Sequence, residues 1–186
     1  MLRRMINLLR YLMVSLFYKL KFGKHVLVGV TTYMIATPKI TVSKGGGVCI
    51  SAHCRVEKCE LAAVSGGKIQ IGEYTSIGGN DLFVSRGKVV IGTHCSIAPN
   101  VSIYDHNHIF GASGLRDGYT IKDIKIGNNV WIGVGTIILA GTTIGDNCVI
   151  GAGTIVYGNI PDNSLVTNSR EMKIKKLIDI SETSKI

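Results

Sequence analysis

The sequence predicts an all-β protein built as a parallel β-helix. From Ile126 the chain divides into six successive hexads that begin with Ile or Val, and four of the six have Gly in second place. This period is neither the 3.6 residues of an α-helix nor the two of a single strand. A repeat of six is typical of a parallel β-helix, in which short strands stack coil upon coil. Three hexads make one coil, so their leading aliphatic residues line up as stacks in the core.

Earlier segments keep the same phase, with shifts of register between runs. The fifth place of each hexad is small or apolar, and Gly in second place suits a bend with little room for a side chain. The earlier leading residues are Ile71, Ile77, Ile91, Ile97 and Ile103, and the fifth places are Thr75, Cys95, Val101, Val130, Thr136, Thr142, Cys148 and Thr154.

Length and composition favour one domain with short appendages. A chain of 186 residues with 46% apolar content buries a sizeable core. We expect a basic amphipathic helix at 1–24, the β-helix at 25–161 and a short helical tail at 162–186. Between Ile109 and Ile126 the phase is lost, which predicts an excursion loop at about 110–125.

The positive charge lies at the N-terminal end. Nine basic residues and no acidic residue precede Glu57, whereas the remaining chain has twelve of each sign. This gradient indicates that the basic end of the molecule meets an anionic partner, either lipid headgroups or nucleic acid.

The first 23 residues read as a basic, apolar helix. Its longest uncharged run, Tyr11 to Tyr18, has eight residues, whereas a spanning helix needs about 20. The segment also lacks the small-residue cleavage site of a signal peptide. It either packs on its own domain or lies in a membrane surface with its cations on headgroups. We expect peripheral contact of residues 1–24 with an anionic membrane, and no nucleic acid partner.

The cysteines predict buried thiols rather than a metal site. Their number is odd and no two have the CxxC spacing; they are Cys49, Cys54, Cys59, Cys95 and Cys148. Free thiols suit a reducing compartment, so we expect a cytoplasmic protein, placed on the inner face of the cell membrane if the helix binds there.

Two longer motifs carry a family resemblance. The text "IGTHCSIAPNVSIYDHNH" followed by "IGNNVWIGVGTIILAGTTIGDNCVIGAGTIV" resembles the hexapeptide-repeat acyltransferases, and among them the galactoside, maltose and polysaccharide O-acetyltransferases. The resemblance implies a left-handed β-helix that assembles as a homotrimer. It also implies acetyl-CoA in a cleft between neighbouring subunits, and a sugar acceptor, lipid-linked or nucleotide-linked, in surface polysaccharide biosynthesis.

The same resemblance aligns the family's catalytic histidine with His106. A sugar hydroxyl is a weak nucleophile at neutral pH while a thioester is already activated, so one base near pH 7 is what the reaction lacks. His106 takes fourth place in its hexad, near a corner where side chains face outward. Asn80, Asp105 and His108 are the candidates for acceptor binding; Asp105 alternatively orients the site, and His108 alternatively closes the loop.

The resemblance also assigns residues to the cofactor. Lys173 and Lys175 offer charge to the CoA phosphates, although the family's usual Gly and Pro are replaced in this stretch, and a solvated helix face is the competing interpretation. The other cofactor candidates are Trp131, Gly133, Val134, Ala152, Tyr157 and Gly158.

Three other functions fit the same repeat. An N-acetyltransferase on an amino sugar is one, and a non-catalytic scaffold is another. The third is a metal-dependent lyase similar to carbonic anhydrase, for which the histidines are the candidate ligands. The spacing of the histidines fits the acetyltransferases better than the lyase.

Overall fold

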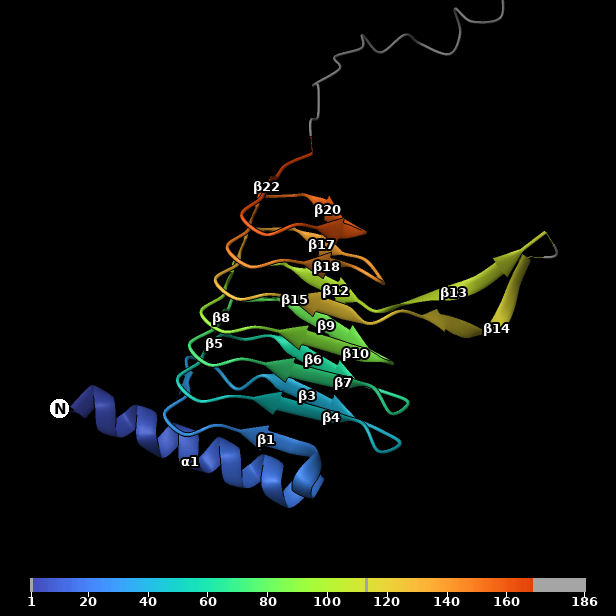
Figure 1. The fold of residues 1–186 in the computed structure, drawn as a ribbon. Helices are drawn as coiled ribbons and strands as arrows, with labels where there is room; N and C mark the ends of the chain where they lie inside the picture. The colour runs from blue at the N-terminus through green and yellow to red at the C-terminus, as the bar shows by residue number, and fades with distance from the viewer. Residues whose placement is uncertain (1, 113, 169–186) are drawn as a thin grey trace, which may run out of the picture.

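The protein is a three-sided parallel β-solenoid with one helix across its N-terminal end and one hairpin projecting from its side (Figure 1). A computed structural model describes residues 2–112 and 114–168. The expected parallel solenoid and N-terminal helix are confirmed.

Each side of the solenoid is one parallel sheet. Each strand pairs in register with the strand one coil further along, so that Ile91 lies beside Ile126, and Ile126 beside Ile144. Sheet A contains β1 (Val26–Val28), β4 (Gly47–Ile50), β7 (Lys68–Ile71), β10 (Lys88–Ile91), β15 (Ile124–Ile126), β18 (Thr143–Ile144) and β21 (Asn159–Ile160). Sheet B contains β2 (Tyr33–Met34), β5 (Arg55–Val56), β8 (Ser76–Ile77), β11 (Ser96–Ile97), β16 (Trp131–Ile132), β19 (Val149–Ile150) and β22 (Leu165–Val166). Sheet C contains β3 (Lys39–Val42), β6 (Glu60–Ala63), β9 (Leu82–Ser85), β12 (Ser102–Tyr104), β17 (Ile137–Ile138) and β20 (Ile155–Val156).

The core is a column of branched side chains inside the solenoid. All the leading and fifth-place residues named above are buried. Phe83, the largest of the fully buried side chains, fills the interior at β9. The predicted stacks of the hexad are therefore the actual core.

The corners depend on the fourth place of the hexad. Asn or Gly occupies this place in many coils and has a left-handed backbone there, as at Asn129 with φ 54° and Gly135 with φ 69°. Asn tolerates this region and Gly enters it freely. The glycines in second place allow neighbouring coils to approach closely. A Cβ on Gly133 would lie 2.6 Å from the backbone nitrogen of Ala152 in the next coil.

The solenoid continues past its expected end at residue 161. Strands β21 and β22 pair with β18 and β19 and begin a further coil. Residues 162–168 are therefore part of the solenoid instead of the expected helical tail. The rest of that expected tail, 169–186, lies outside the described residues.

The excursion is a hairpin and begins earlier than the lost periodicity predicts. Strands β13 (His106–Gly111) and β14 (Gly114–Ile121) pair antiparallel. The chain therefore leaves the solenoid at His106 rather than at about residue 110. The backbone N–H of Lys122 donates to the carbonyl of Asp105 at 2.8 Å, so both ends of the hairpin meet at one corner.

Helix α1 (Leu2–Phe22) closes the first coil and is followed by a 3₁₀ turn at Gly23–His25. Its inner face buries Val14 and Tyr18, and the Tyr18 hydroxyl donates to the carbonyl of Pro38. Arg10 donates to the carbonyls of Met34 and Ile35. Among the described residues, no helix has the length and apolar character needed to cross a membrane.

The five cysteines are free thiols, and all except the partly exposed Cys49 are buried. Burial raises the pKa of the Cys59 thiol to about 12, helped by the nearby Asp81 carboxyl. The Cys59 thiol therefore stays protonated and behaves as a small apolar group.

Asp81 is a buried acid that directly precedes strand β9, at the corner between sheets B and C. Its Oδ1 accepts the Val101 N–H at 2.8 Å, whereas Oδ2 has no hydrogen-bond partner among the described residues. Burial raises the pKa of this carboxyl from 3.8 to about 7. The folded protein therefore holds its proton over a pH range in which the unfolded chain has already lost it.

We expect Asp81→Asn to reduce the pH dependence of stability. The pKa is raised in the folded state, so the free energy of unfolding is highest below about pH 4 and falls as the pH rises to about 7. The amide has no such titration, and above pH 7 the variant should be the more stable protein. Denaturant unfolding of both proteins at pH 4.5 and 7.5 measures the difference; equal pH dependence in the two would contradict the burial of a protonated acid.

Candidate active site

The alternation of strand β12 decides which way the site residues face. Ile103 points into the core, Tyr104 is partly exposed and Asp105 is buried again. His106 then faces outward at the corner between sheets C and A, as its place in the hexad predicts. The backbone that precedes His106 is held firmly, because β12 is paired on both sides, by β9 and by β17.

Asp105 is a fully buried carboxylate surrounded by donors. Its oxygens accept the Ser85 hydroxyl at 2.6 Å, the Arg86 N–H at 2.9 Å and the Gly87 N–H at 2.9 Å. The Nδ1 of His106 lies 3.0 Å from Oδ1. Asp105 is buried and lies behind the histidine, so its position favours the alternative in which it orients the site over direct contact with the acceptor.

The contact with Asp105 selects the tautomer of His106. A carboxylate with these partners is an acceptor, so Nδ1 carries the hydrogen and Nε2 has the free lone pair. The His106 side chain is 12% exposed. The ring therefore presents a proton acceptor at the surface, held by a buried group behind it.

The hairpin packs an aromatic side chain against His106. Tyr119 of β14 lies edge-on to His106 with ring centroids 5.2 Å apart, and it also contacts His108 at 4.7 Å. The Arg86 guanidinium stacks over the ring of Tyr119, 3.7 Å from its centroid. The exposed His108 thus shares a side with His106, as the extended chain predicted.

The remaining candidates fall at two different corners. Tyr157 and Gly158 follow β20, so they lie at the His106 corner, two coils further along sheet C. Asn80, Val134 and Ala152 lie at the corner between sheets B and C, where they precede β9, β17 and β20. Lys173 and Lys175 lie outside the described residues.

One chain does not bring the two corners together. From Asn80 to Arg86, whose N–H binds Asp105, the chain runs along β9 at about 3.3 Å per residue, so the corners are roughly 17–20 Å apart. Asn80 therefore cannot share an acceptor hydroxyl with the His106 of its own chain.

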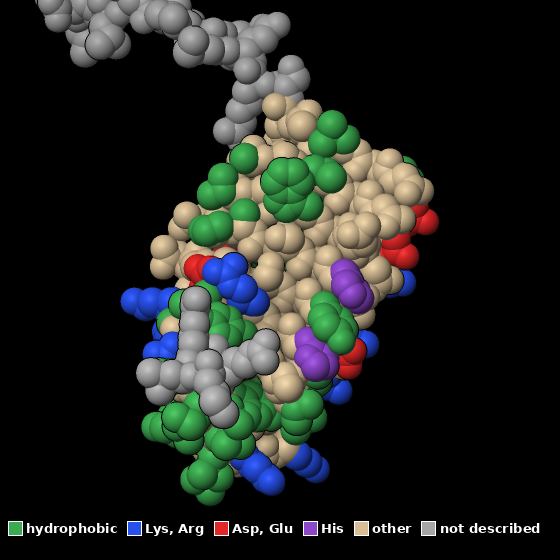
Figure 2. Space-filling model, turned by 90° about the vertical axis from the view of Figure 1, so that its left-hand side faces the viewer, with side chains coloured by type: hydrophobic (Ala, Val, Ile, Leu, Met, Phe, Trp, Pro, Cys, Tyr) green, Lys and Arg blue, Asp and Glu red, His purple; other side chains and the backbone are tan. Residues whose placement is uncertain are grey.

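Exposed apolar side chains surround the corner between sheets B and C. Trp131 is 57% exposed and Val134 48% exposed, and Leu165 lies further along sheet B. Figure 2 looks onto the β2–β22 side and shows a group of hydrophobic side chains over the end remote from α1. This surface suits an apolar partner or the pantetheine arm of a cofactor.

Sequence reasoning missed the residues that support His106. Ser85 and Arg86 lie in a stretch where the repeat shifts register, which is the only sign of them in the sequence. Tyr119 could not be found, because its approach to His106 depends on the pairing of β13 with β14.

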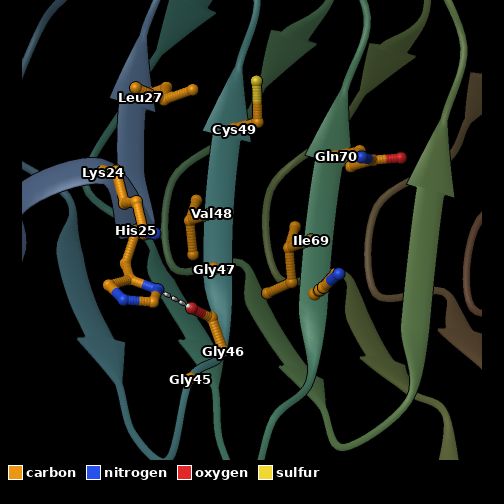
Figure 3. Close-up of a pocket in the computed structure, with 11 residues that line it drawn as sticks. Lys24, His25, Leu27, Gly45, Gly46, Gly47, Val48, Cys49, Ile69 and Gln70 are labelled. Atoms are coloured by element: carbon orange, nitrogen blue, oxygen red, sulfur yellow. Dashed lines mark hydrogen bonds between the residues drawn. The ribbon is translucent and has the colours of Figure 1, made fainter.

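The pocket at the start of sheet A is separate from this cluster. It has a volume of about 290 Å³ and is lined by residues of β1, β4 and β7 with the turns around them (Figure 3). His25 Nδ1 donates to the carbonyl of Gly46 at 2.8 Å there. Across the described part of the chain, no group of three or more His, Cys, Asp or Glu residues is placed to hold a metal ion.

Comparison with known proteins gives a family match on the regular part of the solenoid. Residues 123–158 match the family model for the bacterial transferase hexapeptide, six repeats. The chain is 31% identical to a galactoside O-acetyltransferase of Lactococcus lactis over 70% of its own length and 63% of that protein. It is 32% identical to the putative lipopolysaccharide biosynthesis O-acetyl transferase WbbJ of Escherichia coli, over 58% of its own length and 57% of that protein. The chain therefore spans less than two thirds of the length of these relatives.

A solved structure shares the fold. A point mutant of AntD, an N-acyltransferase from Bacillus cereus, in complex with coenzyme A and dTDP-4-amino-4,6-dideoxyglucose, aligns over 91% of this chain and 93% of its own, with a TM-score of 0.64 and 21% identity. At this identity the likeness shows the fold alone. Together, these findings confirm the expected resemblance: the chain carries the hexapeptide repeats of bacterial transferases and is similar to galactoside and polysaccharide O-acetyltransferases.

Proposed function

We propose that the protein is an acetyltransferase that moves the acetyl group of acetyl-CoA to a sugar hydroxyl in surface polysaccharide biosynthesis. The observation that carries the proposal is the buried Asp105 carboxylate that holds Nδ1 of the outward-facing His106. The relatives support the sugar and the acetyl group, since one acts on galactosides and another is assigned to lipopolysaccharide biosynthesis.

The proposed reaction needs one base and no covalent enzyme intermediate. Nε2 of His106 takes the proton of the acceptor hydroxyl as the oxygen attacks the thioester carbonyl carbon. The tetrahedral intermediate then collapses with cleavage of the carbon–sulfur bond, and the CoA thiolate takes the proton from Nε2. Asp105 stabilises the imidazolium that exists between these two steps.

We further propose that the active site forms between subunits of a homotrimer of left-handed solenoids. The two corners that carry the candidate residues are too far apart in one chain, so a site using both needs the B–C corner of one subunit beside the C–A corner of the next. The exposed Trp131 and Val134 at the B–C corner support this arrangement, because contact with a neighbouring subunit would remove them from water.

The cofactor would lie between the same two corners of neighbouring subunits. In this arrangement Trp131, Gly133, Val134 and Ala152 line the pantetheine path from one subunit. The other subunit contributes Tyr157, which is 72% exposed, and the adjacent Gly158, both at the corner of its own His106. Acetyl-CoA is a co-substrate in this proposal, and no metal takes part.

A second candidate is transfer to an amino sugar. The observation in its favour is the fold shared with AntD, an N-acyltransferase that was crystallised with an amino-sugar nucleotide. A panel of hydroxyl and amino sugar acceptors, with the products identified by mass spectrometry, separates the two reactions. An N-acetyl product with no ester product would replace the first proposal by the second.

His106→Ala should lower kcat by about 10²–10⁴-fold, the usual contribution of a general base. Affinity for CoA and the oligomeric state should stay unchanged, because the imidazole is not part of the core. His53→Ala is the matched control, since His53 lies exposed at another corner, between sheets A and B. Steady-state kinetics and calorimetry with CoA measure both effects; wild-type turnover in His106→Ala would exclude it as the base.

Asp105→Asn should lower kcat while leaving the KM for acetyl-CoA close to wild type. The amide offers one acceptor oxygen where several donors converge, so the ring of His106 loses its fixed tautomer. Ser85→Ala removes one of these donors and is the milder variant in case Asp105→Asn does not fold. A rise in KM without loss of kcat in the Ser85→Ala variant would contradict a positioning role for this network.

A site shared between subunits should show complementation. We expect Asn80→Ala and His106→Ala homotrimers to be poorly active, whereas mixed trimers contain some sites in which both residues are intact. Activity of the co-expressed mixture should therefore exceed that of either homotrimer. A mixture no more active than the average of the two would place both residues in the site of one chain.

A further inference from the structure

The outer face of α1 is an extended apolar surface that the described residues of the fold leave without a partner. Nine of the side chains that the structure describes on this helix are large, hydrophobic and more than half exposed. They are Met5, Ile6, Leu8, Leu9, Leu12, Met13, Leu16, Phe17 and Leu20. A contiguous apolar surface of this kind marks an interaction site.

These residues form one face and not a scatter. At about 100° per residue they cover the half of the helix opposite Val14 and Tyr18, which pack on the first coil. The helix runs across the end of the solenoid, so this face points away from every coil (Figure 1). Figure 2 shows the same hydrophobic group at the α1 end of the molecule, with Lys and Arg beside it. Folding of the single chain therefore leaves this face in water.

The charged residues on α1 and in the turn that follows it are all of one sign. Lys19 and Lys21 lie in the last turn of α1 and Lys24 follows it, and no acidic residue precedes Glu57 in the chain. Lys24 and Lys68 line the pocket at the foot of sheet A (Figure 3), which extends the basic surface beyond the helix. The surroundings of the apolar face therefore favour an anionic partner.

We propose that the outer face of α1 docks the protein on an anionic lipid bilayer, with the helix axis in the plane of the membrane. The apolar side chains enter the headgroup and acyl boundary, and the flanking lysines meet lipid phosphates. A second copy of the chain fits this face less well, because antiparallel or parallel pairing of two such helices brings their cations together with no acid to compensate them.

This docking fixes the height of the proposed active site, a consequence that rests on the proposed function. His106 follows β12, three coils beyond β3, which corresponds to about 14 Å at the spacing of neighbouring strands. The helix adds about 10 Å. The reaction would then take place about 25 Å above the surface, within reach of a saccharide carried on a membrane lipid and out of reach of the lipid headgroups themselves.

Symmetry strengthens the attachment. In the proposed homotrimer, rotation about one axis leaves the height along that axis unchanged, so all three copies of α1 lie at one level. Three weak contacts on one bilayer then act together.

The test uses the purified full chain and two kinds of vesicle. One is phosphatidylcholine alone, and the other contains about one third phosphatidylglycerol, a fraction that gives a clear surface charge. We expect co-sedimentation with the anionic vesicles, weakened by salt. Leu20→Glu and Leu165→Glu form a matched pair, since the two leucines are 78% and 72% exposed and lie at opposite ends of the solenoid.

Leu20→Glu should lower the ratio of vesicle-bound to free protein by on the order of tenfold. The change removes a leucine that enters the lipid and adds a negative charge near the lipid phosphates. Leu165→Glu should bind the vesicles as the wild type does, and Leu20→Glu should retain acetyl transfer to a soluble acceptor. Equal binding by all three proteins would overturn the proposal, as would equal binding to neutral vesicles. A fall in molecular mass on Leu20→Glu without lipid would also overturn it, because a second copy of the chain would then cover the face.

Discussion

The vertical register of the coils is the constraint on which the rest of the structure depends. Each strand pairs with the same position of the strand above and below, so one residue type per place of the hexad is repeated along a whole edge or core column. Branched residues in first place and small residues in fifth place satisfy the interior. Because the core leaves so little freedom, the outward and corner positions are fixed as well.

The His106 site is where this constraint is broken. The fourth place of the hexad, which in most other coils has a left-handed backbone at Asn, Gly, His or Tyr, here begins the hairpin strand β13. Two residues after Ile103, the next inward position holds the carboxylate of Asp105 instead of an apolar group. A buried charge of this kind is tolerated only with its hydrogen bonds made, and Ser85, Arg86 and Gly87 of the coil below provide them. The presence of Asp105 at this inward position therefore accounts both for the departure from the repeat and for the orientation of the His106 imidazole.

The two other surfaces for which a function is proposed follow from the shape of a solenoid. A stack of coils has an open end that would leave core residues of the first coil in water, and the inner face of α1 covers them with Val14 and Tyr18. The opposite face of the same helix is then free for a partner. The corners are long parallel edges, so residues that act together can lie on different edges and meet only when two molecules pack side by side. The proposed membrane contact and the proposed shared active site would thus be separate properties of the end and of the edges.

Sequence by itself determined the parallel solenoid, its core residues, the N-terminal helix and the outward position of His106, because each of these depends on a period that can be read along the chain. Only the tertiary structure decided the roles of the irregular segments. The start of the hairpin at His106, the burial of Asp105 and the contact of Tyr119 with both histidines depend on antiparallel pairing and on strand alternation at one corner. The separation of Asn80 from His106 likewise appears only when the chain is folded, since it is set by the width of sheet C and not by distance along the sequence.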